Sequence, residues 1–199
     1  MTDLSLKEAL AFVERETHLR TKSYRMLSDG VQGELLQAFS LLVRPRAILE
    51  IGTFTGYATL CLSRGLQPGG VVDTIEKDDE MTDIFLRAFS IAGADGIHTY
   101  QGDAKEIIPT LDRIYDIVYI DADKREYRAY FDLVFDKVAV GGYILADNVL
   151  WSGKLEQEKM PSDRQTVSIR DFDSMIVSDP RISTVILPVR DGLAFMRKL

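Results

Sequence analysis

The sequence predicts an α/β protein with a doubly wound, mostly parallel sheet of seven strands that ends in an antiparallel hairpin. Three observations support this prediction. Short apolar segments alternate with amphipathic helical segments along most of the 199 residues. The apolar segments are continuous, which is typical of parallel strands that helices cover on both faces. The last two segments are joined through Arg190-Asp191-Gly192, where a tight turn favours a hairpin.

Two helices are expected before the first strand, at residues 6–18 and 31–42, with a loop between them. Ser5 and Glu8 have the spacing of a capping box at the start of the first helix. The apolar residues of the second helix that we expect to face inward are Leu35, Leu36, Phe39 and Leu42. We expect a single domain over residues 1–199, with N-terminal helices in 1–45 and the α/β core in 46–199.

Each apolar segment predicts a strand and each amphipathic segment a helix. Strands are expected at residues 47–49, 71–75, 97–101, 115–120, 143–146, 182–188 and 193–197. Helices are expected at residues 55–66, 79–92, 104–111, 126–138 and 167–177. Residues 152–165 are polar and charged, and we expect a surface loop there.

The amino-acid composition argues against several classes of protein. Apolar residues make up 46% of the chain, as in globular proteins, and no segment has the length and apolarity of a membrane span. The net charge of −7 disfavours a nucleic-acid backbone as the general partner. The single cysteine, Cys61, excludes an internal disulfide and is expected to be a buried thiol. The first residues contain acids where a secretory signal would be basic, so we expect a cytoplasmic protein.

The segment Ala-Ile-Leu-Glu-Ile-Gly-Thr-Phe-Thr-Gly-Tyr at residues 47–57 has the pattern of a strand, a tight glycine turn and a helix start. Gly52 allows a sharp turn and a close approach of a ligand to the backbone. The dinucleotide pattern G-x-G-x-x-G is absent, and Glu50 would repel a pyrophosphate. Because an acid can hold an ammonium group, the segment indicates a ligand such as S-adenosylmethionine. The alternative is a strand, turn and helix with no ligand.

Acids follow several of the predicted strands, at the sheet edge where open parallel sheets bind ligands. Glu76 ends the second strand and has the position of a carboxylate that accepts hydrogen bonds from ribose hydroxyls. An ordinary solvated acid is the alternative. Asp103 follows the third strand and fits either an acceptor for an adenine amino group or the cap of the next helix.

Two neighbouring strands end in oxygen-bearing side chains: Asp121 after one, and Asp147 with Asn148 after the next. Hard cations such as Mg²⁺ prefer oxygen ligands, so these three residues predict a divalent-cation site. A capped turn beside an unrelated acid is the alternative. Lys124 lies three residues after Asp121, and a nearby cation disfavours its ammonium form, so Lys124 is a candidate general base. A surface lysine paired with Asp121 or Asp123 is the alternative.

These residues resemble the cation-dependent O-methyltransferases, the group that contains catechol and caffeoyl-coenzyme A O-methyltransferases, and especially their short bacterial members. The resemblance extends from about Met26 to the end of the chain and is most specific at residues 49–57, 119–124 and 146–151. It implies the Rossmann-like fold of class I S-adenosylmethionine-dependent methyltransferases, and it implies a homodimer. The cofactor residues that it implies are Met26, Ser28, Glu50, Gly52, Phe54, Glu76, Asp103 and Asp121. The metal ligands that it implies are Asp121, Asp147 and Asn148. It also implies two catalytic residues, Lys124 as the base and Asp121.

The resemblance implies methyl transfer to one hydroxyl of a catechol-like small aromatic, with Mg²⁺, or else Mn²⁺ or Ca²⁺, at the metal site. Tyr24, Trp151 and residues 151–165 are candidate walls for the aromatic ring, although Trp151 is also compatible with plain packing. Ala58 stands where many relatives carry a serine that meets the cofactor, and Asp123 stands where the mammalian catechol enzyme has a tryptophan. These departures concern the substrate rather than the class of reaction.

Three alternatives remain open. A nicotinamide dehydrogenase shares the fold class but needs the missing glycine pattern. A non-catalytic protein that binds S-adenosylmethionine needs Glu50 and Glu76, but has no need for Asp121, Asp147 and Lys124 together. A hydroxyl of transfer RNA is the alternative acceptor, because one bacterial type of relative modifies transfer RNA.

Overall fold

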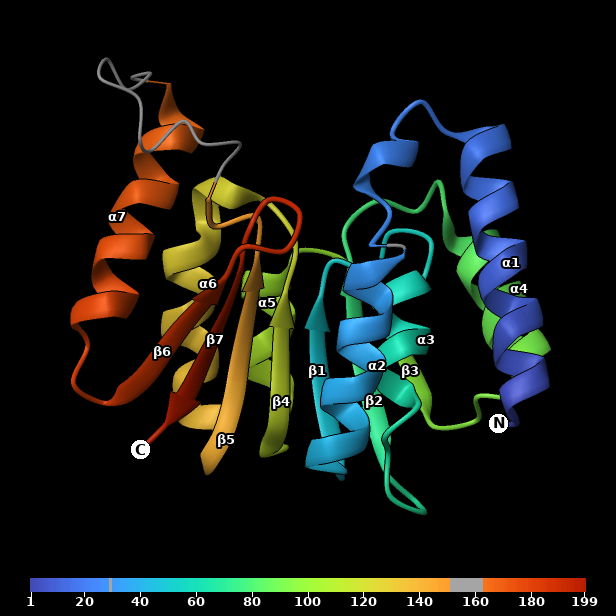
Figure 1. The fold of residues 1–199 in the computed structure, drawn as a ribbon, viewed down its shortest axis with the longest axis horizontal. Coiled ribbons are helices and arrows are strands. Elements are labelled where there is room, and N and C mark those ends of the chain that lie inside the picture. Colours follow the sequence, from blue (N-terminus) through green and yellow to red (C-terminus); the bar gives the residue numbers. More distant parts are fainter. Residues whose placement is uncertain (29, 151–162) are drawn as a thin grey trace. The chain divides into compact units, whose positions relative to one another are not determined.

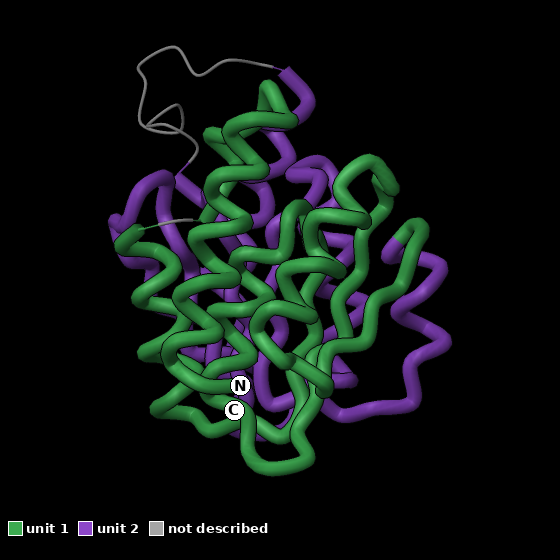
Figure 2. Tube along the Cα trace, turned by 90° about the vertical axis from the view of Figure 1, so that its right-hand side faces the viewer, with its two compact units in different colours: residues 1–103 green, residues 104–199 purple. Residues whose placement is uncertain are grey.

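The computed structural model describes residues 1–28, 30–150 and 163–199, which form two compact units, residues 1–103 and residues 104–199 (Figures 1 and 2). The predicted class is confirmed: the protein is α/β, and its seven strands form a mostly parallel sheet with an antiparallel C-terminal hairpin. The expected organisation as one domain, with residues 1–45 set apart as N-terminal helices, stays a prediction. No helix among the described residues combines the length and the apolarity that crossing a bilayer requires.

The first unit contains three parallel strands in the order β3-β2-β1 and the helices that precede and connect them. Its strands are β1 (Ala47–Ile51), β2 (Val71–Glu76) and β3 (Ile97–Gln101). Its helices are α1 (Asp3–Arg20), the 3-10 turn η1 (Tyr24–Met26), α2 (Val31–Val43), α3 (Tyr57–Ser63) and α4 (Thr82–Ala92). All five residues of β1 are buried, as expected for a strand that is covered on both faces.

Helix α1 lies beside α4 in the first unit (Figure 1). The Ser5 hydroxyl donates to the carbonyl oxygen of Ala92 at 3.1 Å, and the Arg20 guanidinium pairs with Asp83 at 2.6 Å. The helix begins with a capping box between Thr2 and Ser5, so the predicted box between Ser5 and Glu8 is wrong. The reason is that the helix begins at Asp3, three residues earlier than the apolar spacing indicates.

The second unit contains four strands in the order β4-β5-β7-β6. These are β4 (Tyr115–Ile120), β5 (Val138–Asp147), β6 (Ile182–Leu187) and β7 (Leu193–Lys198). Its helices are α5 (Ala104–Ile107), α6 (Tyr127–Val134) and α7 (Arg164–Ser178), with 3-10 turns η2 (Ile108–Thr110), η3 (Lys124–Glu126) and η4 (Phe135–Lys137). Strands β4 and β5 are parallel, and β7 pairs antiparallel with both β5 and β6.

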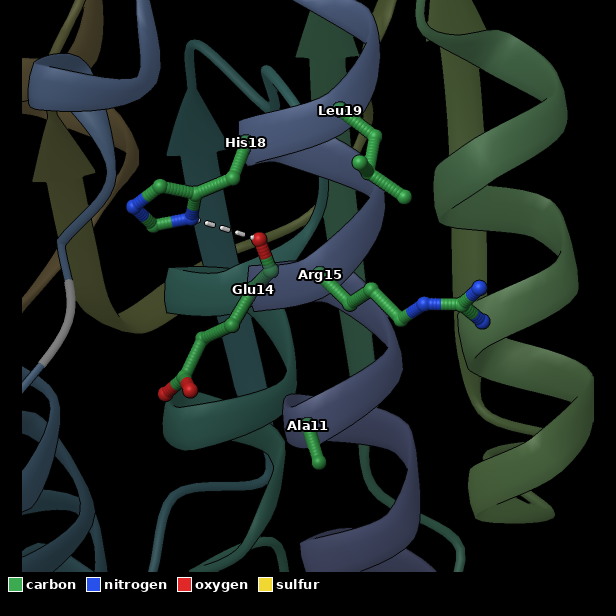
Figure 3. Close-up of a pocket in the computed structure, with 5 residues that line it drawn as sticks. All are labelled: Ala11, Glu14, Arg15, His18 and Leu19. Carbon is green, nitrogen blue, oxygen red and sulfur yellow. Dashed lines mark hydrogen bonds between the residues drawn. The ribbon is translucent and has the colours of Figure 1, made fainter.

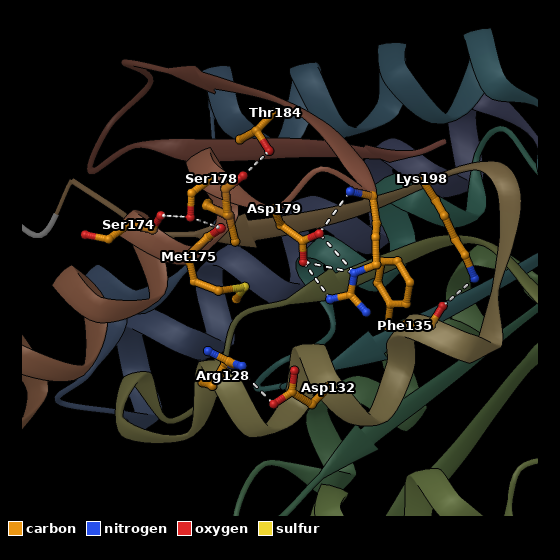
Figure 4. Close-up of polar contacts among 11 residues, drawn as sticks. Arg128, Asp132, Phe135, Ser174, Met175, Ser178, Asp179, Thr184 and Lys198 are labelled. Atoms are coloured by element: carbon orange, nitrogen blue, oxygen red, sulfur yellow. Dashed lines mark hydrogen bonds and ion pairs between the residues drawn. The ribbon is translucent and has the colours of Figure 1, made fainter.

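The C-terminal hairpin is fastened to the rest of its unit by Lys198 (Figure 4). The Lys198 ammonium donates to the carbonyl oxygens of Phe135 at 2.7 Å and Val138 at 2.9 Å, and it lies 4.6 Å from the centre of the Phe135 ring. At the end of α7, Asp179 accepts hydrogen bonds from Arg181. The bond from Lys198 to Val138 ties the end of β7 to the start of β5, and β5 ends at Asp147, one of the predicted metal ligands.

Candidate functional site

The turn after β1 departs from ordinary backbone geometry at three residues. Gly52, Phe54 and Gly56 have φ angles of +101°, +49° and +86°. A positive φ is costly for any residue with a Cβ atom, so glycine suits positions 52 and 56, whereas Phe54 adopts an unfavourable backbone conformation. At Gly56 a Cβ atom would also come within 2.9 Å of Phe85 and within 2.8 Å of Phe89. The predicted glycine turn is therefore present, and residues 52–56 are named the donor loop below.

Glu76, the last residue of β2, holds the donor loop. Its Oε2 accepts the backbone N–H of Phe54 at 2.7 Å, and its Oε1 accepts the N–H of Asp78 at 2.9 Å. A carboxylate oxygen has two lone pairs, so each oxygen retains capacity for a further donor. The half-buried carboxylate is thus fixed in direction and remains suited to accept hydrogen bonds from a diol.

Glu50 is wholly buried at the penultimate position of β1. Its Oε2 accepts hydrogen bonds from the hydroxyls of Thr59 and Thr74, the latter at 2.5 Å. Thr74 donates its only proton to Glu50, so the hydroxyl of Thr53, 2.5 Å away, donates to Thr74. These three threonines stabilise a buried carboxylate beside the donor loop. Contact between Glu50 and an ammonium group stays a prediction.

Helix α1 also fastens the donor loop. The buried hydroxyls of Thr17 and Thr55 lie 3.0 Å apart, and Thr17 also donates to the carbonyl oxygen of Val13 at 2.6 Å. The Tyr57 hydroxyl donates to Glu14 at 3.2 Å. The leading helix is therefore joined to the donor loop at Thr55 and to the start of α3 at Tyr57, which the sequence pattern alone does not reveal.

The other predicted cofactor residues of the first unit have different surroundings. Asp103 pairs with the exposed Lys77 at 2.9 Å. Ser28 is buried and accepts a 3.5 Å contact from Gln32, whereas Met26 in η1 is 62% exposed. Tyr24, a candidate wall for the substrate, stacks on His18 with ring centres 5.1 Å apart. Trp151 and residues up to 162, which were also candidates, lie outside the described residues.

The predicted metal ligands lie at the ends of two paired strands of the second unit. Ile120 of β4 is in register with Ala146 of β5, so Asp121 and Asp147 follow at equivalent positions on parallel neighbours. Neighbouring strands lie about 4.8 Å apart, which brings the two acids to one edge of the sheet. The register puts the two acids on adjacent strand ends, and a common metal site for them stays a prediction.

Asn148 has a φ angle of +59°, a left-handed conformation that asparagine tolerates better than most residues. The strand ends at Asp147, so the alternation of side chains that separates neighbours along a strand no longer applies. Asp147 is 3% exposed; its Oδ1 accepts the N–H of Asn148 at 2.8 Å, and its Oδ2 lies 3.5 Å from the Tyr119 hydroxyl. The chain therefore turns directly after Asp147, as the prediction of a shared site for the two residues requires.

Lys124 joins Asp121 to Tyr127. Its Nζ donates to Oδ1 of Asp121 at 2.8 Å and to the Tyr127 hydroxyl at 2.6 Å, and its side chain is only 11% exposed. The surrounding residues cover most of this side chain, and its role as a base, rather than as an ion-pair partner only, stays a prediction. The pairing with Asp121 that the sequence allowed is present.

Tyr127 is wholly buried, and its hydroxyl also reaches the carbonyl oxygens of Asp147 at 3.0 Å and Ile120 at 3.2 Å. Burial, and then the negative charges of Asp121 and Asp147, raise the pKa of Tyr127 well above its usual range. The phenol is therefore neutral at physiological pH. That both acids act on this one hydroxyl supports their placement near each other.

The donor chemistry of Asp121, Asp147 and Asn148 fits a hard divalent cation, since all three offer oxygen atoms. The described residues contain no group of three or more His, Cys, Asp and Glu side chains that could hold a metal. The predicted set contains two carboxylates and an amide, so any cation there would complete its coordination with water or substrate oxygens.

A pocket of about 500 Å³ lies elsewhere, on helix α1 (Figure 3). Its lining residues are Ala11, Glu14, Arg15, His18 and Leu19. All five belong to one helix, and none is a predicted site residue. Cys61 is likewise unsuited to chemistry, because burial raises the pKa of its thiol and keeps it protonated.

The seven-stranded α/β sheet with its antiparallel hairpin places the protein in the class of S-adenosylmethionine-dependent methyltransferases, whose solved structures share this fold. The family model described as O-methyltransferase matches residues 2–199, so the chain belongs to the O-methyltransferase family. The predicted resemblance is thereby confirmed. The protein is an S-adenosylmethionine-dependent O-methyltransferase.

Relatives and solved structures agree with this assignment. The chain is 30% identical over 199 residues to caffeoyl-CoA O-methyltransferase of Stellaria longipes, covering 93% of this chain and 83% of the relative. The O-methyltransferase from Bacillus cereus in complex with SAH has a TM-score of 0.86 and 29% identity, covering 100% of this chain and 92% of that one. TomG from Streptomyces achromogenes in complex with SAM has a TM-score of 0.85 and 28% identity, covering 100% and 91%.

Proposed function

We propose that the protein is a divalent-cation-dependent O-methyltransferase that methylates one of two vicinal hydroxyls on a small, catechol-like aromatic. The observation that carries this proposal is the register of β4 and β5, in which Asp121 and Asp147 follow equivalent ends of neighbouring strands, with the largely covered Lys124 paired to Asp121. Vicinal hydroxyls match such a site because two adjacent oxygens can complete the coordination of one hard cation. The family and its caffeoyl-CoA relatives support an aromatic acceptor.

Asp121, Asp147 and Asn148 would hold the cation, which in proteins with such ligands is most often Mg²⁺, with Mn²⁺ or Ca²⁺ as alternatives. When bound, the cation would make the proton of a chelated hydroxyl more acidic. Lys124 Nζ accepts that proton, and Asp121 stabilises the ammonium group that results. The acceptor oxygen then forms a bond to the methyl carbon while the carbon–sulfur bond breaks, and the electron pair goes to sulfur.

The donor loop and its neighbours would bind S-adenosylmethionine. Gly52 and the backbone around Phe54 would admit the ligand closely, Glu76 would accept from the ribose hydroxyls, and Asp103 from the adenine amino group. Glu50, Met26 and Ser28 complete the proposed set in the first unit, and Asp121 of the second unit is proposed to contact the cofactor as well as the cation. Holding donor and acceptor in attack geometry can supply on the order of 7–11 kcal/mol of the barrier reduction.

We expect Glu76→Gln to weaken the binding of S-adenosylmethionine by about 10- to 100-fold, because each hydrogen bond to a charged acceptor contributes roughly 1.5–3 kcal/mol. Isothermal titration with S-adenosylmethionine and S-adenosylhomocysteine measures the change. Glu80→Gln is the matched control, since Glu80 is an exposed acid of the segment that follows β2. Equal affinities for wild type and Glu76→Gln would contradict the ribose assignment.

The acceptor is tested by a screen with labelled S-adenosylmethionine, with and without a chelator of divalent cations. We expect transfer to a catechol with vicinal hydroxyls, little transfer to the corresponding monophenol, and loss of transfer when the chelator is present. Restoration by Mg²⁺, Mn²⁺ or Ca²⁺ identifies the cation. Equal methyl transfer to the catechol with and without the chelator would refute the metal-dependent part of the proposal.

Two further arms of the same screen address the alternatives. Transfer to a transfer RNA but not to any catechol would replace the aromatic acceptor with an RNA hydroxyl. Binding of S-adenosylmethionine without transfer to any acceptor would support the alternative of a non-catalytic protein that binds S-adenosylmethionine. A homodimer belongs to the proposal on the strength of the resemblance, and light scattering of the purified protein measures it.

A further inference from the structure

Tyr127 stands at the centre of the second unit's polar residues, although nothing in the sequence marks it as functional. It is the first residue of α6, and no part of it is exposed to solvent. Its ring packs edge-on against Phe172 of α7, with ring centres 5.5 Å apart. The ring therefore supplies packing, and the buried hydroxyl group requires a separate explanation.

The hydroxyl reaches both strand ends that carry the predicted ligands. It lies 3.2 Å from the carbonyl oxygen of Ile120, the residue directly before Asp121, and 3.0 Å from the carbonyl oxygen of Asp147. A carbonyl oxygen can only accept, so the phenol proton is directed toward these two atoms. One hydroxyl thus cross-links the last peptide of β4 to the last peptide of β5.

The same oxygen accepts a hydrogen bond from Lys124 at 2.6 Å, while Asp121 accepts another at 2.8 Å. The Lys124 nitrogen is tetrahedral, with three positions besides its bond to carbon. Hydrogen bonds to Tyr127 and Asp121 occupy two of them and so determine the direction of the third, where the lone pair of a base stands. A general base needs this directed lone pair, because proton transfer depends on alignment with the acidic hydrogen.

We propose that Tyr127 is a positioning residue that fixes the spacing of the two ligand-bearing strand ends and aims the amine of Lys124. This inference rests on the proposed function, in which Lys124 is the base and Asp121 and Asp147 are metal ligands. Groups that orient metal ligands and bases typically change activity or metal affinity 10- to 100-fold when they are removed.

The test is Tyr127→Phe, which keeps the ring and its contact with Phe172 and removes only the oxygen. The matched control is Tyr130→Phe on the same helix. Tyr130 is also buried, and its hydroxyl donates to Glu126 at 2.9 Å. Both substitutions delete one buried phenol oxygen from α6, but only the first touches the strand ends and Lys124.

We expect kcat of Tyr127→Phe to fall about 10- to 100-fold, with the KM for S-adenosylmethionine within about twofold of wild type. Calorimetric titration with Mn²⁺ alone gives a readout that is independent of turnover, and we expect its Kd to rise about tenfold. Tyr130→Phe should stay within about twofold of wild type in kcat, KM and Mn²⁺ affinity.

A second comparison separates positioning from a general loss of structure. In a Lys124→Met background at saturating Mg²⁺, where a weaker cation site no longer limits the rate, the added Tyr127→Phe substitution should change the residual rate less than about twofold, because residues that act through one another are not additive. Additive losses in the double variant would overturn the proposal. So would equal losses in Tyr127→Phe and Tyr130→Phe, an unchanged kcat in Tyr127→Phe, or the disappearance of its cooperative unfolding transition.

The failure of the proposed function has a different signature. If the wild-type enzyme transfers methyl groups equally well with a chelator present, the metal assignment fails whatever Tyr127→Phe does. If the chelator stops the wild-type enzyme and Tyr127→Phe is unaffected, the metal assignment stands and the role of Tyr127 fails.

Discussion

Asp121→Asn and Asp147→Asn are each expected to reduce methyl transfer to a catechol by about a thousandfold or more. Asparagine keeps the size of the side chain but removes the negative charge that a divalent cation requires. The electrostatic stabilisation that a bound cation gives to a reacting oxygen is several kcal/mol, and each 1.36 kcal/mol corresponds to a factor of about ten in rate. Initial rates at saturating Mg²⁺ and donor measure the loss.

Thermal unfolding supplies the readout that does not depend on turnover. A cation at one hundred times its Kd should stabilise the wild-type protein by about 2.7 kcal/mol, and the two variants should lose this increase. Asp132→Asn is the matched control, because it removes a carboxylate of α6 that is 52% exposed and pairs with Arg128. A wild-type unfolding temperature that does not respond to Mg²⁺ or Mn²⁺ would contradict the metal site.

Binding of S-adenosylhomocysteine distinguishes the two acids. Asp147→Asn should leave this affinity within about twofold of wild type, because Asp147 is proposed to contact only the cation. Asp121 is proposed to contact the cofactor as well, so Asp121→Asn should weaken the affinity by at least about threefold, which corresponds to about 0.7 kcal/mol or more. Equal affinities in both variants would restrict Asp121 to the metal.

The strands were predictable where an apolar segment is bounded by clear turn residues. Ile97–Gln101 and Tyr115–Ile120 begin and end where the sequence predicts. Strand β5 begins at Val138 rather than at residue 143, because Gly141 and Gly142 interrupt the pattern without ending the strand. The register between β4 and β5 shifts there, and Gly141 has a φ of +81°, so the glycines form an irregularity within a strand.

The inward face of α2 was predicted only in part. Leu36 is fully buried, but Leu42 is 83% exposed, so its predicted inward position is wrong. Helical spacing identifies which residues share a face of a helix, but it does not reveal how wide a stripe the neighbouring elements cover. The small residues Gly33 and Ser40 mark the covered side: Ser40 donates to the Leu62 carbonyl at 2.5 Å, and Gly33 abuts Tyr57.

The predicted acids of the site follow from charge at the ends of apolar strands, which is visible in the sequence. The groups that hold them do not stand out in this way. Thr59, Thr74 and Tyr127 belong to segments that have the pattern of ordinary packing, and only the folded chain shows that their hydroxyls meet Glu50 and Lys124. A tyrosine three residues after a candidate base, on the same face of the chain, was the available signal.

Lys124→Met is expected to lower kcat by about 10²- to 10⁴-fold, the usual contribution of a general base, and to leave the KM for S-adenosylmethionine nearly unchanged. Methionine retains most of the buried apolar stem of lysine, whose ammonium lies 4.9 Å from the centre of the Tyr127 ring. The variant should therefore fold normally, and its defect should be confined to proton removal. Pre-steady-state measurement of a single turnover isolates that step.

The size of the loss separates the two roles of Lys124. A general base contributes about 10²- to 10⁴-fold to the rate, so the single-turnover rate of Lys124→Met should fall by that amount. Lys105→Met is the matched control, since Lys105 pairs with Glu126 at 2.5 Å in the same unit and is not one of the proposed site residues. A rate within threefold of wild type for Lys124→Met would reduce Lys124 to an ion-pair partner of Asp121. The proton would then have to leave the acceptor through water, and the covered position of Lys124 would have to be explained by packing alone.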